Sequence, residues 1–143
     1  MHINSFELPV ELAEALRTGS LQRERGSWPL KHNLDTYGNR LETELGSLHD
    51  LPSMAKKSAA LSKDFQSDGM YGTNYPEFAG PGGIPDITDF SQIICFGDSG
   101  DGAPFCLDYR AGIPASVIWW DDVYWRKIAP DFRTFLNLFA LAR

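Results

Sequence analysis

Three short runs of sequence decide the fold: Ile93-Ile94-Cys95-Phe96-Gly97, Phe105-Cys106-Leu107-Asp108-Tyr109-Arg110 and Ser116-Val117-Ile118-Trp119-Trp120-Asp121-Asp122. Each run is rich in β-branched and aromatic residues and is bounded by Gly, Pro or Asp, which is the pattern of a β-strand. The first gap, residues 98–104, holds seven residues and predicts a long hairpin loop rather than a two-residue turn. The second gap, residues 111–115, contains glycine and proline, so we expect the chain to reverse there again. The runs together predict an antiparallel meander.

Apolar periodicity predicts three helices around the meander. Leucines recur every fourth residue within residues 7–18, which indicates one apolar stripe. Residues 47–64 predict a second helix with Ser47 or Ser53 as its N-cap. Residues 131–142 predict a closing helix with a phenylalanine-rich face. The side chains expected to cover the sheet are Leu8, Leu12, Leu16, Leu51, Ala55, Ala59, Leu61, Phe65, Phe132, Phe135, Leu136 and Phe139.

Two further strands and one long loop complete the expected fold. Residues 40–45 alternate between apolar and polar side chains, as a half-buried strand does, and residues 28–30 contain a proline that favours an edge strand. Residues 66–89 are rich in Gly and Pro and carry Tyr71 and Tyr75, which is typical of an adaptable binding loop. The alternative is that its aromatic residues pack back over the core. The sequence predicts one α+β domain over residues 1–143, with a central, mainly antiparallel twisted sheet and packed helices.

Composition restricts the class of partner. The chain has 143 residues, a formal net charge of -6 and an isoelectric point near 4.9. A nucleic-acid-binding surface needs a basic footprint, so this balance argues against nucleic acid as a partner. It favours a basic protein partner, because complementary charge speeds association. The alternative is that the charge only keeps the protein soluble.

The cysteines and histidines do not show the spacing of a metal site. Cys95 and Cys106 lie on the two strands that flank the first loop, so we expect them to be neighbours. Because the amino terminus lacks a secretory signal, we interpret both as reduced, buried thiols of a cytoplasmic protein. Two cysteines and three scattered histidines show no zinc-ligand spacing. No run reaches the ~18 apolar residues of a membrane span.

The loop that begins at Asp98 does not match a catalytic or ion-binding motif. Its oxygen-rich sequence resembles a calcium loop, but position twelve is Tyr109 where an EF-hand needs glutamate. Ser99 lacks the flanking glycines of a nucleophile elbow, and no Gly-Lys-Ser/Thr follows for phosphate binding. We therefore expect an acidic turn held by side-chain-to-backbone hydrogen bonds, no catalytic residue, no metal and no cofactor. The chain is predicted not to be an enzyme.

Acidic and aromatic residues gather at the ends of the predicted strands. Trp119 and Trp120 are consecutive on a strand, so they must point to opposite faces of the sheet. Aromatic rings beside carboxylates form a good receptor for Arg and Lys side chains. The alternative is that Tyr124 and Trp125 only pack the turn after the strand. The candidate partner-binding residues are Asp98, Asp101, Asp108, Trp119, Trp120, Asp121, Asp122, Tyr124, Trp125, Tyr71 and Tyr75.

The same stretch resembles a known family. The run from Phe96 to Arg110, the Val-Ile-Trp-Trp-Asp-Asp run at 117–122 and the Phe-Arg-Thr-Phe-Leu run at 132–136 are similar to the signature region of the SUKH superfamily, here residues 93–139. That superfamily is named for yeast cell-wall regulators and is widespread among bacterial toxin-immunity proteins.

The resemblance implies an α+β fold and a non-catalytic module that binds and neutralises a toxin domain, often a nuclease. An acidic inhibitor complements the basic substrate face of a nuclease. One alternative is a regulatory interaction module without a toxin, which the fungal members imply. Another is an enzyme that acts on a small ligand in a tryptophan-lined pocket.

Overall fold

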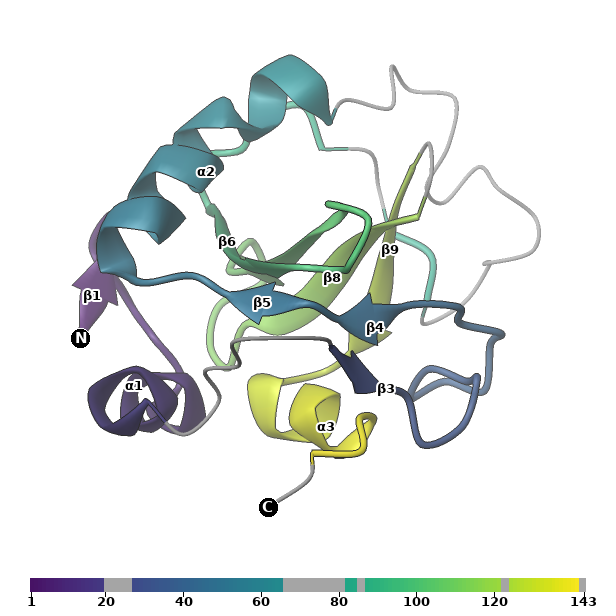
Figure 1. Cartoon of the computed structure of the whole chain (residues 1–143). Coiled ribbons are helices and arrows are strands. Elements are labelled where there is room, and N and C mark those ends of the chain that lie inside the picture. The colour runs from purple at the N-terminus through teal and green to yellow at the C-terminus, as the bar shows by residue number, and fades with distance from the viewer. Residues whose placement is uncertain (20–26, 66–81, 85–86, 122–123, 142–143) are drawn as a thin grey trace.

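The computed structural model describes the chain except for residues 20–26, 66–81, 85–86, 122–123 and 142–143 (Figure 1). The strands are β1 (His2–Ile3), β2 (Phe6–Glu7), β3 (Trp28–Pro29), β4 (Glu44–Leu45), β5 (Ser47–Leu48), β6 (Ile93–Asp98), β7 (Pro104–Asp108), β8 (Ser116–Asp121) and β9 (Tyr124–Ala129). The helices are α1 (Val10–Thr18), α2 (Leu51–Asp64) and α3 (Phe132–Asn137).

A five-stranded sheet with the order β5-β6-β7-β8-β9 forms the centre, and every neighbouring pair in it is antiparallel. Strands β6 to β9 are consecutive in the chain, which confirms the predicted meander. Cys95 lies opposite Cys106 across β6 and β7, as expected of neighbouring cysteines, and both are free and buried. Two small antiparallel pairs, β1-β2 and β3-β4, lie outside this sheet. The predicted α+β class is confirmed.

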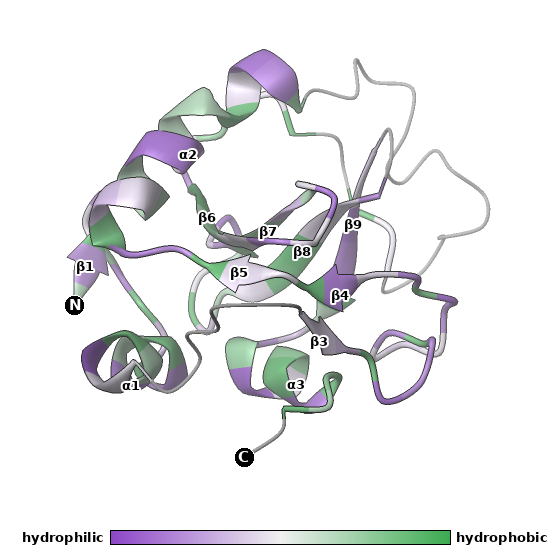
Figure 2. Cartoon of the chain, in the orientation of Figure 1, coloured by the Kyte–Doolittle hydropathy of each residue, from purple (hydrophilic) through white to green (hydrophobic). Residues whose placement is uncertain are grey.

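Helices cover both faces of the sheet. In Figure 1, α2 lies on one side of the central strands, and α1 and α3 lie on the other. Figure 2 shows hydrophobic residues along β6 and β8 and in α3, whereas much of α2 is hydrophilic. Alternation along β6 explains this arrangement, because Ile94 and Phe96 pack with α1 and α3, while Ile93 and Cys95 pack with α2. Both faces of the sheet are therefore buried, and this explains why the strand sequences are nearly continuous runs of apolar residues.

The helices differ from the predicted ones at their ends. Helix α1 starts at Val10 because Phe6–Glu7 pairs with His2–Ile3 as β2. Helix α2 starts at Leu51 rather than at residue 47, since Asp50 is its N-cap and accepts a hydrogen bond from the Ser53 N–H at 2.9 Å.

Two other helix predictions were wrong. The buried face of α2 is made by Met54, Ser58 and Leu61, whereas Ala55 and Ala59 are exposed. Helix α3 ends at Asn137, five residues before the predicted end.

The strands also differ from the expected pattern. In residues 40–45 only Glu44–Leu45 forms a strand, and the chain then continues into β5 where a helix was predicted. The first hairpin loop is shorter than predicted, because Asp98 and Pro104 pair with each other as strand residues. Strand β9 was not predicted; its first two residues, Tyr124 and Trp125, were expected at the end of the preceding strand or in the turn after it. The predicted strand at Trp28–Pro29 is confirmed and pairs with β4, and the Pro29 carbonyl oxygen also accepts a hydrogen bond from the Ala140 N–H at 2.8 Å.

Candidate functional site

A pocket of about 530 Å³ lies beyond the end of β8, next to the turn between β6 and β7. We call it the acidic pocket. Its lining residues are Glu42, Phe65, Asp101, Gly102, Ala103, Trp119, Trp120 and Asp121. Four of them are predicted binding residues, from the β6–β7 turn and from β8. The fold therefore brings these carboxylates and indole rings to one place.

The β6–β7 turn is built by its own polar groups. Ser99 is buried; its hydroxyl donates a hydrogen bond to Asp101 and accepts one from the Ala103 N–H at 3.1 Å. The Gly100 N–H donates to the Glu44 carboxylate at 2.8 Å, which ties the turn to β4. This network confirms the expected acidic turn held by side-chain-to-backbone bonds, and it fixes the exposed Asp101 at the mouth of the pocket.

The second carboxylate of the pocket belongs to a buried ion cluster. Asp121 Oδ2 lies 2.9 Å from Arg126 Nη1, and Arg126 Nη2 lies 2.6 Å from Asp35 Oδ2. Arg126 also donates to the carbonyl oxygen of Arg40 at 2.9 Å. We call Arg126, Asp35 and Asp121 the Arg126 cluster. It holds Asp121 in place but neutralises part of its charge, and the exposed Glu42 pairs with Arg40 at 2.6 Å, so the unshared negative charge of the pocket comes mainly from Asp101.

The two tryptophans lie on opposite faces, as the sequence predicted. Trp119 packs in the core with α3, and Trp120 packs with Phe65 and Trp125 on the α2 side. Trp119 is buried, whereas Trp120 is half-buried. Among the described residues, the indole N–H of Trp119 has no hydrogen-bond acceptor. The pocket therefore offers one partly exposed ring, that of Trp120.

Several predicted binding residues lie away from the pocket opening. Asp108 is at the far end of β7, where it is buried and pairs with Arg110 at 2.8 Å. Tyr124 and Trp125 are buried in β9, and the Trp125 indole N–H donates to the Phe65 carbonyl oxygen at 2.8 Å. They are packed side chains, but they lie in a strand and not in the turn that the packing alternative described. Tyr71, Tyr75 and Asp122 lie outside the described residues.

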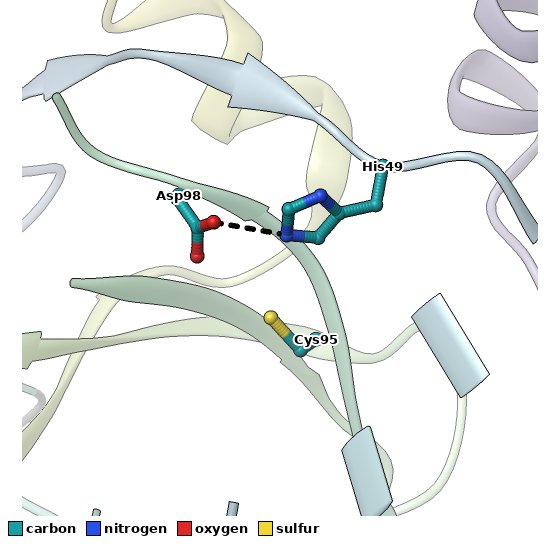
Figure 3. A group of neighbouring side chains, drawn as sticks. All are labelled: His49, Cys95 and Asp98. Carbon is teal, nitrogen blue, oxygen red and sulfur yellow. Dashed lines mark ion pairs between the residues drawn. The ribbon is translucent and has the colours of Figure 1, made fainter. Parts of the chain in front are cut away.

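A second group of polar side chains, the His49 cluster, consists of His49, Cys95 and Asp98 (Figure 3). One nitrogen, sulfur or oxygen atom from each residue lies within 4.8 Å of the others. His49 Nε2 is 3.2 Å from Asp98 Oδ2, yet it has no hydrogen-bond partner among the described residues. The histidine side chain is only 10% exposed, and Cys95 is buried.

The backbone of β6 places this cluster. Residues three apart on a regular strand face opposite ways, but a bulge between Cys95 and Gly97 turns Asp98 to the same side as Cys95. The bulge is held by Ser58 of α2, whose hydroxyl accepts a hydrogen bond from the Cys95 N–H at 2.9 Å.

Gly97 lets the next strand come close. A Cβ at Gly97 would lie 2.5 Å from the Ser47 carbonyl oxygen in β5. The His49 N–H just after β5 then donates to the Phe96 carbonyl oxygen at 2.9 Å. Local sequence reasoning missed this cluster because its histidine is distant in the chain, although a glycine inside a strand is a recognised sign of a bulge.

The electrostatics of the His49 cluster favour charged side chains. Burial lowers the pKa of His49, but the neighbouring Asp98 carboxylate and Cys95 thiol outweigh it and raise that pKa to about 9. The Cys106 thiol hydrogen-bonds Cys95 and, with His49, lowers the pKa of Cys95 against the effect of burial. Burial raises the pKa of Cys106. Of the two facing thiols, Cys95 is the better thiolate.

A third hollow, the apolar groove, has about 560 Å³ and lies between α1, the loop before β8 and α3. Its walls include Val10 and Ile113, which are 79% and 81% exposed. Exposed apolar side chains of this size mark a surface that differs in chemistry from the acidic pocket. The groove contains none of the predicted binding residues.

Comparison with known proteins identifies the family. Within the described part of the chain, none of the helices has the length and apolar content needed to cross a membrane. The curated proteins and the solved structures gave no match. The model of the SMI1 / KNR4 family (SUKH-1) matches residues 5–138, which includes every strand and helix except β1. The chain belongs to the SMI1 / KNR4 family (SUKH-1).

Proposed function

We propose that this chain is a non-catalytic binding module whose acidic pocket receives a basic side chain of a protein partner. The partner class we propose is a bacterial toxin domain, of which a nuclease is the best electrostatic match. The observation that carries the proposal is the convergence of three carboxylates and the half-buried ring of Trp120 on one pocket. The alternative is a regulatory module of the same family that binds a basic partner other than a toxin.

The chemistry of the pocket suits an Arg or Lys side chain. Asp101 supplies negative charge at the opening, with a smaller contribution from Glu42, which also pairs with Arg40 at 2.6 Å. The half-buried ring of Trp120 supplies a face for a cation. Buried aromatic anchors dominate binding energy, whereas exposed charges at a rim mainly increase the association rate.

The lining residues do not favour catalysis. Among the residues that line the acidic pocket, none is a Ser, Cys, His or Lys that a neighbouring base could activate as a nucleophile. The carboxylates are engaged in the turn network and in the Arg126 cluster. We therefore place binding ahead of a small-ligand reaction in this pocket.

The test first asks whether the neighbouring gene encodes a toxin domain. It then measures binding of the purified chain to that domain by surface plasmon resonance at several salt concentrations. The double variant Asp101→Asn with Glu42→Gln should associate more slowly than wild type in low salt. The difference should shrink as the Debye length falls from about 10 Å at 0.1 M to about 3 Å at 1 M. Asp121 is left unchanged because it pairs with buried Arg126.

The tryptophans separate binding from stability. Trp120→Ala should raise the dissociation rate at least about tenfold, as loss of a hot-spot anchor does. Trp119→Ala should instead lower the free energy of unfolding by about 3–5 kcal/mol, because Trp119 is a core residue.

The controls are Asp64→Asn, which changes an exposed carboxylate at the end of α2, and Ile113→Ser in the apolar groove. If Ile113→Ser abolishes binding and the pocket variants bind normally, the partner uses the groove and the pocket proposal is wrong. If the toxin domain does not bind wild type, the immunity proposal is wrong.

A further inference from the structure

The His49 cluster contains the three ligand types that a zinc-like ion prefers. Its atoms are an imidazole nitrogen, a thiol sulfur and a carboxylate oxygen, from the segment after β5 and from β6 (Figure 3). Imidazole and thiolate select Zn²⁺ and related ions over Mg²⁺ and Ca²⁺, which prefer oxygen alone. All three side chains are wholly or mostly buried, unlike the exposed acidic groups common at protein surfaces.

The arrangement of His49 and Asp98 fits two ligands of one ion better than it fits a hydrogen bond. Their atoms are 3.2 Å apart, but Nε2 makes no hydrogen bond and is buried. Bonds of about 2.0–2.2 Å to a tetrahedral ion would place nitrogen and oxygen about 3.3–3.6 Å apart. The buried nitrogen, which makes no hydrogen bond, therefore lies close to the separation that shared coordination requires.

Burial argues against a reactive role for Cys95. Its residue is 1% exposed, so a substrate cannot approach the sulfur, whereas a bare ion is far smaller. The bulge, Gly97 and Ser58 hold the ligands in place through the backbone. Cys95 Sγ also donates a hydrogen bond to the Gly97 carbonyl oxygen at 3.6 Å, which the bond to the ion would replace.

We propose that the His49 cluster is a binding site for Zn²⁺ or a chemically similar thiophilic divalent ion, coordinated by His49 Nε2, Cys95 Sγ and one Asp98 carboxylate oxygen. The fourth position is left for water. The ion would fasten the segment after β5 to β6 and stabilise the edge of the sheet. This inference does not depend on the toxin proposal, and its test uses no protein partner.

The experiment titrates metal-free, reduced protein with Co²⁺ and records its absorption. Co²⁺ replaces Zn²⁺ in such sites, and only a bound thiolate gives a sulfur-to-cobalt charge-transfer band. We expect one Co²⁺ per chain, with the band displaced by Zn²⁺, and a higher melting temperature in Zn²⁺. His49→Gln and Asp98→Asn should weaken affinity for Co²⁺ at least about tenfold, and Cys95→Ala should lose the band.

Cys106→Ala is the matched control, because it removes one buried sulfur from the strand that faces Cys95. It should keep the charge-transfer band. The proposal is wrong if wild type shows no band at one equivalent, or if the band persists in Cys95→Ala. It is also wrong if His49→Gln binds Co²⁺ as tightly as wild type. Circular dichroism checks that each variant folds, and the wild-type and His49→Gln titrations decide the result if Cys95→Ala does not fold.

Discussion

Two polar clusters are buried in this fold, and they differ in what holds them together. In the Arg126 cluster, one guanidinium binds two carboxylates and a carbonyl oxygen from distant parts of the chain. In the His49 cluster, the imidazole nitrogen lies beside a carboxylate without a hydrogen bond. The first cluster uses side chains to join segments of backbone, whereas the second uses backbone to bring side chains together.

This difference indicates different roles. A charged group buried with its partners is costly to disrupt, so the Arg126 cluster fixes the loop around Asp35 and Arg40 against β8 and β9. The His49 cluster is placed by a bulge, a close strand approach at Gly97 and a Ser58 hydrogen bond. Its side-chain atoms make longer contacts, among them the 3.2 Å ion pair between His49 and Asp98 and the 3.6 Å hydrogen bond from Cys95 Sγ to the Gly97 carbonyl oxygen. We therefore expect the two clusters to supply different amounts of stability in metal-free protein.

The largest effect is expected in the Arg126 cluster. Asp35→Ala leaves Arg126 buried without its 2.6 Å partner, and we expect the free energy of unfolding to fall by about 3–5 kcal/mol. Urea denaturation measures this change. Asp64→Ala is the control, because that carboxylate is exposed and its loss should change stability by less than about 0.5 kcal/mol. A loss below about 1 kcal/mol for Asp35→Ala would contradict the structural role of the cluster.

A smaller loss of stability is expected at Gly97, where the close approach of β5 and β6 positions the His49 cluster. In Gly97→Ala the new Cβ would lie 2.5 Å from the Ser47 carbonyl oxygen, so β5 must move, at a cost of about 1–3 kcal/mol. Gly100→Ala is the matched control. Its Cβ would also be too close to an oxygen, but that oxygen is the end of the Glu44 side chain, which can rotate away. If urea denaturation gives the same loss in free energy of unfolding for the two variants, the close approach at Gly97 does not restrict the position of β5.

The sequence pattern predicted those elements that are formed by residues close together in the chain. The meander was predictable because β6, β7 and β8 are apolar runs separated by turn residues, and the paired cysteines followed from that register. The acidic pocket was predicted in part, because Asp101 and Asp121 lie at strand ends that a meander brings together. Glu42 was missed as a pocket residue, because the alternation of apolar and polar residues only places it on the solvent-exposed face of a strand.

The remaining features depend on contacts between distant segments. Residues 47–48 pair with Gly97 and Asp98, and this pairing overrides the helical pattern that their own sequence predicts. Arg126 and Asp35 are 91 residues apart in the chain, so no local spacing indicates their ion pair. His49 meets Cys95 and Asp98 only because β5 lies at the edge of the sheet beside a bulge. Charged and metal-ligating residues of this kind can be placed only once the register is known.

The smallest effect is expected for His49 itself, and it decides between the two roles. If the cluster is structural, removing its imidazole should cost as much as removing Asp35. If it is a ligand site, His49→Gln in metal-free protein should cost less than Asp35→Ala, about 1–2 kcal/mol, because it loses the 3.2 Å ion pair with Asp98 that raises the pKa of His49, while the His49 N–H bond to Phe96 remains. Urea denaturation in the presence of a chelator measures the difference, with His32→Gln as the control at an exposed histidine. A cost near that of Asp35→Ala would mean that the imidazole holds the sheet edge without an ion. A small cost that grows when Zn²⁺ is added would mean that the stabilising interaction is made to the ion, since a ligand that binds only the folded state adds its binding free energy to folding.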